Sequence, residues 1–323
     1  MLDGRNGAPA MNDISPQRTV DPRFAQGGAY SQGRFVPMAE ATISVLDFGF
    51  TRADSCYDVV HVKDGAFFRL PDHLARFAAS MQKRRLAPPE DLARMEAILH
   101  RVTWLTGLSD VYVAMVAIRG RPRPGLPRLI ANCDNHFVAY ALPWIDVLSP
   151  EIQARGGHLW IASIPRIPDA SLDPTAKNYN WMDLNRGLME AQDNGFDTTV
   201  LCDAEGLVTE GPGFNVFIVK GNTVSTSGHG VLQGITRKTV LELAPELGLT
   251  PRVGDITRAE LEDADEVFLA TTAGGVMPIS RINTRITNND SPGPVSRRMK
   301  QLYWAAHGRV QWQTKVRSEE VLF

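Results

Sequence analysis

Hydrophobic positions along the first half of the chain change between a strand-like and a helix-like spacing. Short β-branched or aromatic runs predict strands at residues 42–46, 57–62, 66–70, 111–118 and 136–142. Apolar residues recur every three or four positions after Pro71, which predicts a helix to about residue 85. A second helix is expected to follow Pro88-Pro89 and to end near Leu105. This pattern indicates a small α+β domain over residues 26–143.

The second half of the chain has a different order of elements. Strands are expected at residues 158–163, 197–202, 214–219 and 266–270, and they alternate with helices at about 178–193, 236–247 and 295–307. Residues 144–149 are therefore the expected linker to a larger C-terminal domain, residues 150–323. Residues 1–25 are rich in Pro, Gly, Asn and Asp and are expected to be a mobile arm.

Composition excludes several classes of protein. The 323 residues, 43% of them hydrophobic, are enough for one large domain or two modest ones. A net charge of −2 gives no electrostatic argument for nucleic acid, and no apolar run approaches the length of a membrane span. The beginning of the sequence lacks the apolar stretch of a secretory signal. Cys56, Cys133 and Cys202 have no CxxC spacing, which disfavours a disulfide framework or a zinc site and favours the cytoplasm.

Lysine is scarce, with seven residues against 27 arginines, and Lys177 has unusual neighbours. They read D-P-T-A-K-N-Y-N-W, so they are mostly small or aromatic. A lysine in apolar surroundings has a lowered pKa, and its neutral amine can attack an aldehyde to form a Schiff base. Local context alone favours an ordinary surface lysine at a helix start.

Three further segments carry candidate chemistry. Glu210 stands in E-G-P-G-F-N-V, which places a carboxylate at a tight turn between strands. Gly234-Ile235-Thr236 opens a helix and Thr271-Thr272-Ala273-Gly274-Gly275 follows a strand, so both could bind an anion through backbone N–H groups. Neither is a Walker or G-x-G-x-x-G motif. Arg76, on the first predicted helix, could bind a phosphate with two donors. Taken singly, each segment could be ordinary turn, capping or surface chemistry.

Five segments in this order resemble the fold-type IV aminotransferases, which use pyridoxal phosphate (PLP). The segments are D-H-L-A-R-F, D-P-T-A-K-N-Y-N-W, E-G-P-G-F-N-V, G-I-T-R-K-T-V and T-T-A-G-G-V-M-P-I, and the resemblance covers about residues 27–308. It implies a small α+β domain, a larger domain with a barrel-like β core, PLP at their junction, and a homodimer.

The resemblance also implies a role for each matching residue. Lys177 would form the Schiff base with PLP and move a proton, and Glu210 would pair with the pyridine nitrogen. The phosphate would be held by Arg76, Ile235, Thr236 and Thr272, with Leu232 packed on the ring. The substrate would contact Arg52, Tyr57, Val59, Tyr112, Arg121, Trp181, Thr271 and Ala273.

Within the family, the segments look most like the (R)-selective amine transaminases. Branched-chain enzymes carry Tyr-x-Arg where this chain reads Tyr112-Val113-Ala114, and the Arg-x-His pair of D-amino acid aminotransferases is missing. The (R)-amine pattern Gly-Phe-x-His-Ser-Asp has Arg52 in place of histidine. Arg52, or an arginine of the loop at 119–123 such as Arg121, would bind the carboxylate of a keto acid. Alternatively, Arg52 points to solvent and the arginine loop is simply solvated.

We therefore predict a ping-pong transaminase that moves the amino group of an (R)-amine or D-amino acid to a keto acid such as pyruvate. The alternatives are a branched-chain or D-amino acid aminotransferase, an aminodeoxychorismate-type lyase, and a non-catalytic protein that keeps the fold.

Overall fold

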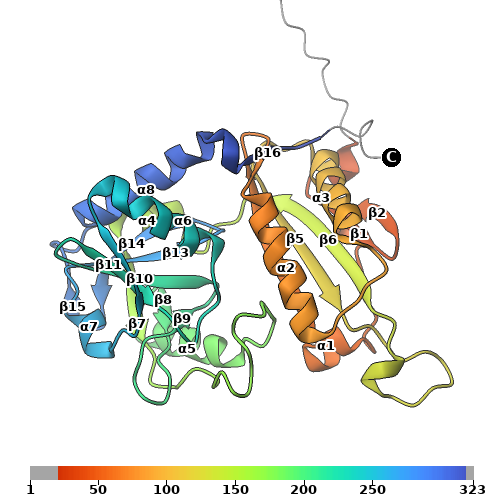
Figure 1. Cartoon of the computed structure of the whole chain (residues 1–323), viewed down its shortest axis with the longest axis horizontal. Helices are drawn as coiled ribbons and strands as arrows, with labels where there is room; N and C mark the ends of the chain where they lie inside the picture. The colour runs from red at the N-terminus through yellow and green to blue at the C-terminus, as the bar shows by residue number, and fades with distance from the viewer. Residues whose placement is uncertain (1–20, 318–323) are drawn as a thin grey trace, which may run out of the picture.

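Two β-sheets with helices packed on them form the protein (Figure 1). The computed structural model describes residues 21–317. The predicted α+β class is confirmed, but the larger sheet is open rather than barrel-like, because its path runs from β12 to β8 without closing. Most of the expected N-terminal arm, residues 1–20, lies outside the described residues. Among the described residues, no helix is both long and apolar enough to cross a membrane.

The first sheet has seven strands in the order β16-β4-β3-β5-β6-β1-β2. One face is covered by α2 (Leu70–Arg84) and α3 (Leu92–Thr106), whose apolar residues pack on the sheet. The strands are β1 Gly28–Ser31, β2 Arg34–Pro37, β3 Ser55–Lys63, β4 Ala66–Phe68, β5 Val111–Ile118, β6 His136–Pro143 and β16 Gln313–Lys315.

Side chains alternate between the two faces of this sheet, as strand geometry requires. Along β3, Cys56 and Val60 pack against the helices. Tyr57 and Val59 belong to a separate apolar cluster on the opposite face. The first sheet therefore presents an apolar face, not covered by α2 and α3, to the rest of the chain.

The second sheet follows the path β12-β11-β10-β13-β14-β7-β8, with β9 paired to β10 and β15 to β14. Its strands are β7 Gly157–Ile161, β8 Thr198–Val200, β9 Glu210–Gly211, β10 Phe214–Lys220, β11 Thr223–Ser227, β12 Thr250–Gly254, β13 Glu266–Thr271, β14 Gly275–Ile282 and β15 Arg285–Ile286. The remaining helices are α1 Phe48–Arg52, α4 Pro150–Arg155, α5 Met182–Asp193, α6 Ile235–Leu243, α7 Arg258–Glu262 and α8 Pro294–Ala305. Helices α6 and α8 pack on one face of the sheet, around Phe217 and Phe268.

Two expected elements differ from the structure. The strand at 42–46 is absent, because Val45 and Leu46 are exposed and the backbone turns there, with the Asp47 N–H donating to the carbonyl of Ser44. The helix expected from 178 begins only at Met182. The side chain of Asn178 accepts from the N–H of Asn180, which holds the preceding residues in a loop.

The chain passes from the first sheet to the second between Pro143 and Pro150, where we expect the domain boundary. After α8, however, the chain returns to the first sheet (Figure 1), where β16 pairs with β4. The last described residues thus belong to the first sheet rather than to the C-terminal half.

A buried arginine also joins the two halves. Arg69 precedes α2, and its guanidinium donates to Glu242 of α6 at 2.5 and 3.1 Å and to Thr239 at 3.1 Å. Its side chain is only 4% exposed. Replacing Arg69 would remove the donor that Glu242 and Thr239 share, so this contact should contribute to the stability of the fold.

We predict that Arg69→Met lowers the free energy of unfolding by about 3 kcal/mol. The reason is the loss of these bonds between Arg69 and α6. Urea denaturation monitored by circular dichroism measures the change. Lys220→Met is the matched control, because Lys220 makes its ion pairs at an exposed site and should change stability little. Equal effects of the two substitutions would contradict the prediction.

Candidate active site

A cavity of about 470 Å³ lies between the apolar face of the first sheet and the second half of the chain. Both halves line it, with Tyr57 and Val59 from β3, and Lys177 and Glu210 from the second half. Of the predicted site residues, thirteen line this cavity: Tyr57, Val59, Arg76, Tyr112, Lys177, Trp181, Glu210, Leu232, Ile235, Thr236, Thr271, Thr272 and Ala273.

Two backbone hydrogen bonds fix the position of Lys177 in the cavity wall. Its N–H donates to Ser80 of α2 at 3.2 Å, and its carbonyl accepts from the Tyr57 N–H at 3.1 Å. Its Nζ lies 4.5 Å from the centre of the Tyr57 ring, and no hydrogen-bond acceptor holds it within residues 21–317. Burial, together with the charge of Arg76, lowers the pKa of Lys177 to about 8. The amine is therefore partly neutral near physiological pH and free to react.

Arg76 enters the cavity wall from α2, fixed by a buried carboxylate. Its Nε and Nη2 donate to the two oxygens of Asp58, each at 2.7 Å, and its Nη1 donates to the carbonyl of Gln233 at 3.1 Å. Asp58 is fully buried and also accepts from His73 at 2.8 Å. Burial alone would raise the pKa of Asp58, but Arg76 and His73 hold it well below its usual range. Two of the five guanidinium N–H groups remain available to an anion.

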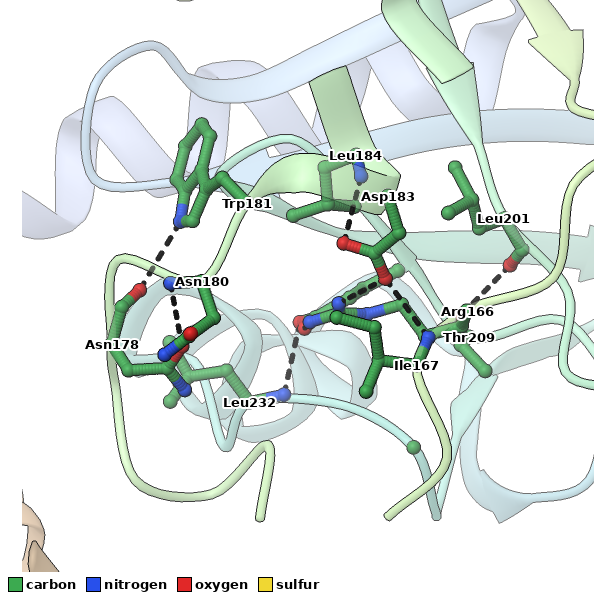
Figure 2. A network of polar contacts seen from close by, with 12 residues as sticks. Arg166, Ile167, Asn178, Asn180, Trp181, Asp183, Leu184, Leu201, Thr209 and Leu232 are labelled. Carbon is green, nitrogen blue, oxygen red and sulfur yellow. Dashed lines mark hydrogen bonds and ion pairs between the residues drawn. The ribbon is translucent and has the colours of Figure 1, made fainter. Parts of the chain in front are cut away.

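Glu210, in β9, is oriented by a second buried network. Its other members, Arg166, Asp183 and Leu232, are labelled in Figure 2. Arg166 donates to Glu210 at 3.0 Å and to Asp183 at 2.6 Å. The N–H of Leu232 donates to the other Glu210 oxygen at 2.9 Å. Burial raises the pKa of Glu210 although Arg166 opposes the shift, so this carboxylate is more basic than usual. Such a group can hold a proton on an aromatic ring nitrogen.

Two turns bring backbone N–H groups to the cavity. Helix α6 begins at Ile235, after Gly234, so its first N–H groups have no partner within the helix. The turn after β13 contains Thr272, and the hydroxyl of Thr271 donates to the carbonyl of Gly213 at 2.7 Å. Because helix starts and such turns attract anions, both segments suit a phosphate or a carboxylate.

Aromatic side chains form the remaining wall. Tyr112, Tyr140 and Trp181 line the cavity, and the Trp181 Nε1–H donates to the carbonyl of Asn178 at 3.2 Å (Figure 2). Tyr179 stacks on Tyr57, with ring centres 4.0 Å apart. This part of the cavity is suited to an apolar or aromatic group.

Arg52 and Arg121, which we expected at the substrate, do not line the cavity of the single chain. The Arg52 guanidinium lies 3.6 Å from the centre of the Phe48 ring, at the end of α1. Arg121 is exposed on the loop after β5. Arg52 lies just before β3 and Arg121 just after β5, and neither side chain lines the cavity that contains Lys177.

Two important residues were missed from the sequence. Neither Asp58 nor Arg166, which stands in I-P-R-I-P, is assigned a role from the sequence. A charged residue between buried positions of a strand could have revealed Asp58, because such a charge needs a partner. An arginine between two prolines gives no comparable signal.

Comparisons with known proteins point to one family. The family model "Amino-transferase class IV" matches residues 55–282. D-alanine aminotransferase of Bacillus licheniformis is 28% identical over 273 residues, covering 83% of this chain and 93% of that protein. Branched-chain-amino-acid aminotransferase of Pseudomonas aeruginosa is 26% identical over 302 residues, covering 90% and 98%. A branched-chain amino acid aminotransferase from T.th., solved with pyridoxamine 5'-phosphate, has a TM-score of 0.83 and 31% identity, covering 90% of this chain and 99% of that one.

We predict that Lys177 in the ligand-free protein reacts with formaldehyde and cyanoborohydride with a midpoint near pH 8. Below this pH the ammonium form predominates and cannot attack, whereas above it the neutral amine does. Mass spectrometry of the Lys177 peptide across a pH series measures the midpoint. Lys220 is the internal control, because Asp263 and Asp265 raise its pKa. Methylation of both lysines at the same pH would be incompatible with the burial argument.

Proposed function

This chain belongs to the class IV aminotransferases, and on that premise we propose that it transfers the amino group of an (R)-amine or a D-amino acid to a keto acid such as pyruvate. One observation carries the donor preference. Arg76 and Arg166 are the arginines in the described cavity wall, and each is already paired with a buried carboxylate. Arg166 is held by Glu210 and Asp183, and the free donors of Arg76 are assigned to the cofactor phosphate. With aromatic side chains in the same wall, the site suits an uncharged substituent on the donor.

Enzymes of this class use PLP, and the residues present fit it. Lys177 offers a reactive amine and Glu210 offers a basic carboxylate. In the same cavity, the start of α6, Arg76 and Thr272 offer hydrogen-bond donors to an anion. When bound, PLP supplies an aldehyde carbon and an electron-withdrawing ring. We assign the phosphate to Arg76, Ile235, Thr236 and Thr272, and the ring face to Leu232.

The chain's own residues would then divide the remaining work. Lys177 Nζ would bind the aldehyde carbon and, once released, move a proton to and from the substrate carbon that bears the amino group. Its pKa near 8 suits both directions of that transfer near neutral pH. Glu210 would hold a proton on the ring nitrogen, with Arg166 and the Leu232 N–H fixing the orientation of the carboxylate.

A branched-chain or D-amino acid aminotransferase is the second candidate. It is favoured by the names of the relatives and by the turn at Thr271–Ala273, which lines the cavity and could bind a substrate carboxylate through backbone N–H groups. The same turn could serve the keto acid acceptor in the first candidate. An aminodeoxychorismate-type lyase would differ from both by releasing pyruvate without an amino acceptor.

We also propose a homodimer in the cytoplasm. The assembly is supported by apolar side chains exposed on neighbouring segments of the first half, since a patch of this kind usually marks an interface. The exposed residues are Val45, Leu46, Phe50, Leu126, Leu129 and Ile130.

A panel of half-reactions tests the proposed donor. The PLP-loaded protein is mixed separately with (R)- and (S)-1-phenylethylamine, D- and L-alanine, and L-leucine, and the absorbance band of the bound cofactor is followed. We expect the band to be lost rapidly with (R)-1-phenylethylamine or D-alanine and slowly with their enantiomers. Rapid loss with L-leucine alone would instead establish the branched-chain alternative.

A substitution tests the position of Arg52. Because its guanidinium packs on Phe48 outside the cavity, we expect Arg52→Ala to leave kcat/KM for both the amine donor and pyruvate nearly unchanged. Arg76→Ala is the positive control, since Arg76 lines the cavity. A selective rise in the KM for pyruvate in Arg52→Ala would restore Arg52 as a carboxylate-binding residue.

A further inference from the structure

Arg237 differs from the other buried arginines. Four arginines are buried in the part of the chain that the structure describes. Three of them contact carboxylates: Arg69 pairs with Glu242, Arg119 with Asp54 and Arg166 with Glu210. Arg237 is 5% exposed, and no Asp or Glu among residues 21–317 lies within ion-pair distance of it.

The hydrogen bonds of Arg237 do not replace a counter-ion. Its Nη1 donates to the side-chain carbonyl of Gln233 at 2.8 Å, and its Nη2 donates to the backbone carbonyl of Ser227 at 2.9 Å. Both acceptors are neutral, and Nε has no acceptor. A buried charge without a partner is strongly unfavourable, and burial accordingly lowers the pKa of Arg237. The folded chain therefore carries an uncompensated positive charge at this point.

The position of Arg237 in its helix adds a second, independent anomaly. It lies in the first turn of α6, and this turn contains no acidic residue. Lys238, which follows, is paired with Asp72, whereas Arg237 has no such partner. Cations at a helix N-terminus oppose the helix dipole, which favours negative charge there. Both anomalies disappear if a negative group occupies the start of α6.

The groove around Arg237 adjoins the active-site cavity. This groove, of about 480 Å³, is lined by Arg237, by Lys238 with its ion-pair partner Asp72, and by Glu242, which pairs with Arg69. It shares Arg76, Gly234 and Ile235 with the cavity. Arg237 thus belongs to the helix turn that lines the cavity, although its own side chain lines only the adjoining groove.

We propose that Arg237 strengthens cofactor binding, because its charge acts through space on a phosphate held at the N-terminus of α6. The inference rests on the proposed placement of the PLP phosphate at Ile235 and Thr236. In the absence of cofactor the buried charge destabilises the fold, and the doubly negative phosphate relieves that penalty when it binds. Arg237 therefore contributes to affinity without direct contact.

The test compares PLP with pyridoxal, which lacks the phosphate. Arg237→Gln removes the charge and keeps polar atoms, whereas Arg237→Lys keeps the charge and loses the fork-shaped donor. We expect Arg237→Gln to raise the Kd for PLP by about tenfold, the order expected for losing one charge near a phosphate. The Kd for pyridoxal should change little, and Arg237→Lys should retain most of the PLP affinity. Fluorescence titration of the cofactor-free chain measures these constants.

Stability provides a readout that does not depend on catalysis. If Arg237 mainly serves the phosphate, the Tm of cofactor-free Arg237→Gln should equal or exceed that of the wild type. A purely structural role predicts a lower Tm and equal loss of affinity for PLP and pyridoxal, and either result would overturn the proposal. So would an Arg237→Lys variant that binds PLP as weakly as Arg237→Gln.

Two controls separate this inference from its premise. Thr236→Val should weaken the binding of PLP more than the binding of pyridoxal. If it does not, the phosphate is not at α6 and the proposed cofactor placement is wrong. If Thr236→Val has this effect and Arg237→Gln does not, only the role of Arg237 fails. Inorganic phosphate is also titrated into the holoenzyme. A rise in Tm that requires Arg237 would reveal a separate anion site in the groove and contradict action on the cofactor.

Discussion

A carboxylate with no exposure to water, Asp58, fixes the geometry around the cavity. Its charge lies on the helix-covered face of the first sheet, so α2 must supply cationic and hydrogen-bonding groups directly above it, and it does so with Arg76 and His73. Two further polar residues of α2 follow at helical spacing. Ser80 accepts a hydrogen bond from the Lys177 N–H, and Lys83 pairs with Asp173. The helix that neutralises the buried charge is thus also the helix that positions the reactive lysine.

Burial governs the chemistry of the site as much as its shape. Burial favours the neutral forms of both Lys177 and Glu210, and a neighbouring arginine further changes the pKa of each. Arg76 pushes the lysine further toward the neutral amine, whereas Arg166 limits how basic the glutamate becomes. Amino transfer on PLP requires an amine that loses its proton easily and a carboxylate that accepts a hydrogen bond from a protonated ring nitrogen.

The sequence was informative where chemistry is local and much less so where it depends on partners far along the chain. Glycine turns, the helix start at Gly234 and the Lys177 loop could be found because each is a short segment with its own composition. The buried partners of Arg76 and Glu210 could not be assigned, since Asp58 and Arg166 lie 18 and 44 residues away from them in sequence. The apolar run at 42–46 misled for a related reason: strand propensity does not provide a neighbouring strand, and without one the segment turns on the surface. Arg52 likewise adjoins a motif in sequence while its side chain packs outside the cavity.

The return of the chain to its first sheet limits how the two halves can move. Because β16 pairs with β4, the halves are joined by two covalent crossings, one at residues 144–149 and one after α8. The two crossings lie side by side, because the ring of Trp144, at the start of the first, is 5.9 Å from the ring of Trp304, which lies at the end of α8 just before the second. Both connections thus hold the halves together at one end of their interface, so any opening that admits a substrate should be widest at the end away from them.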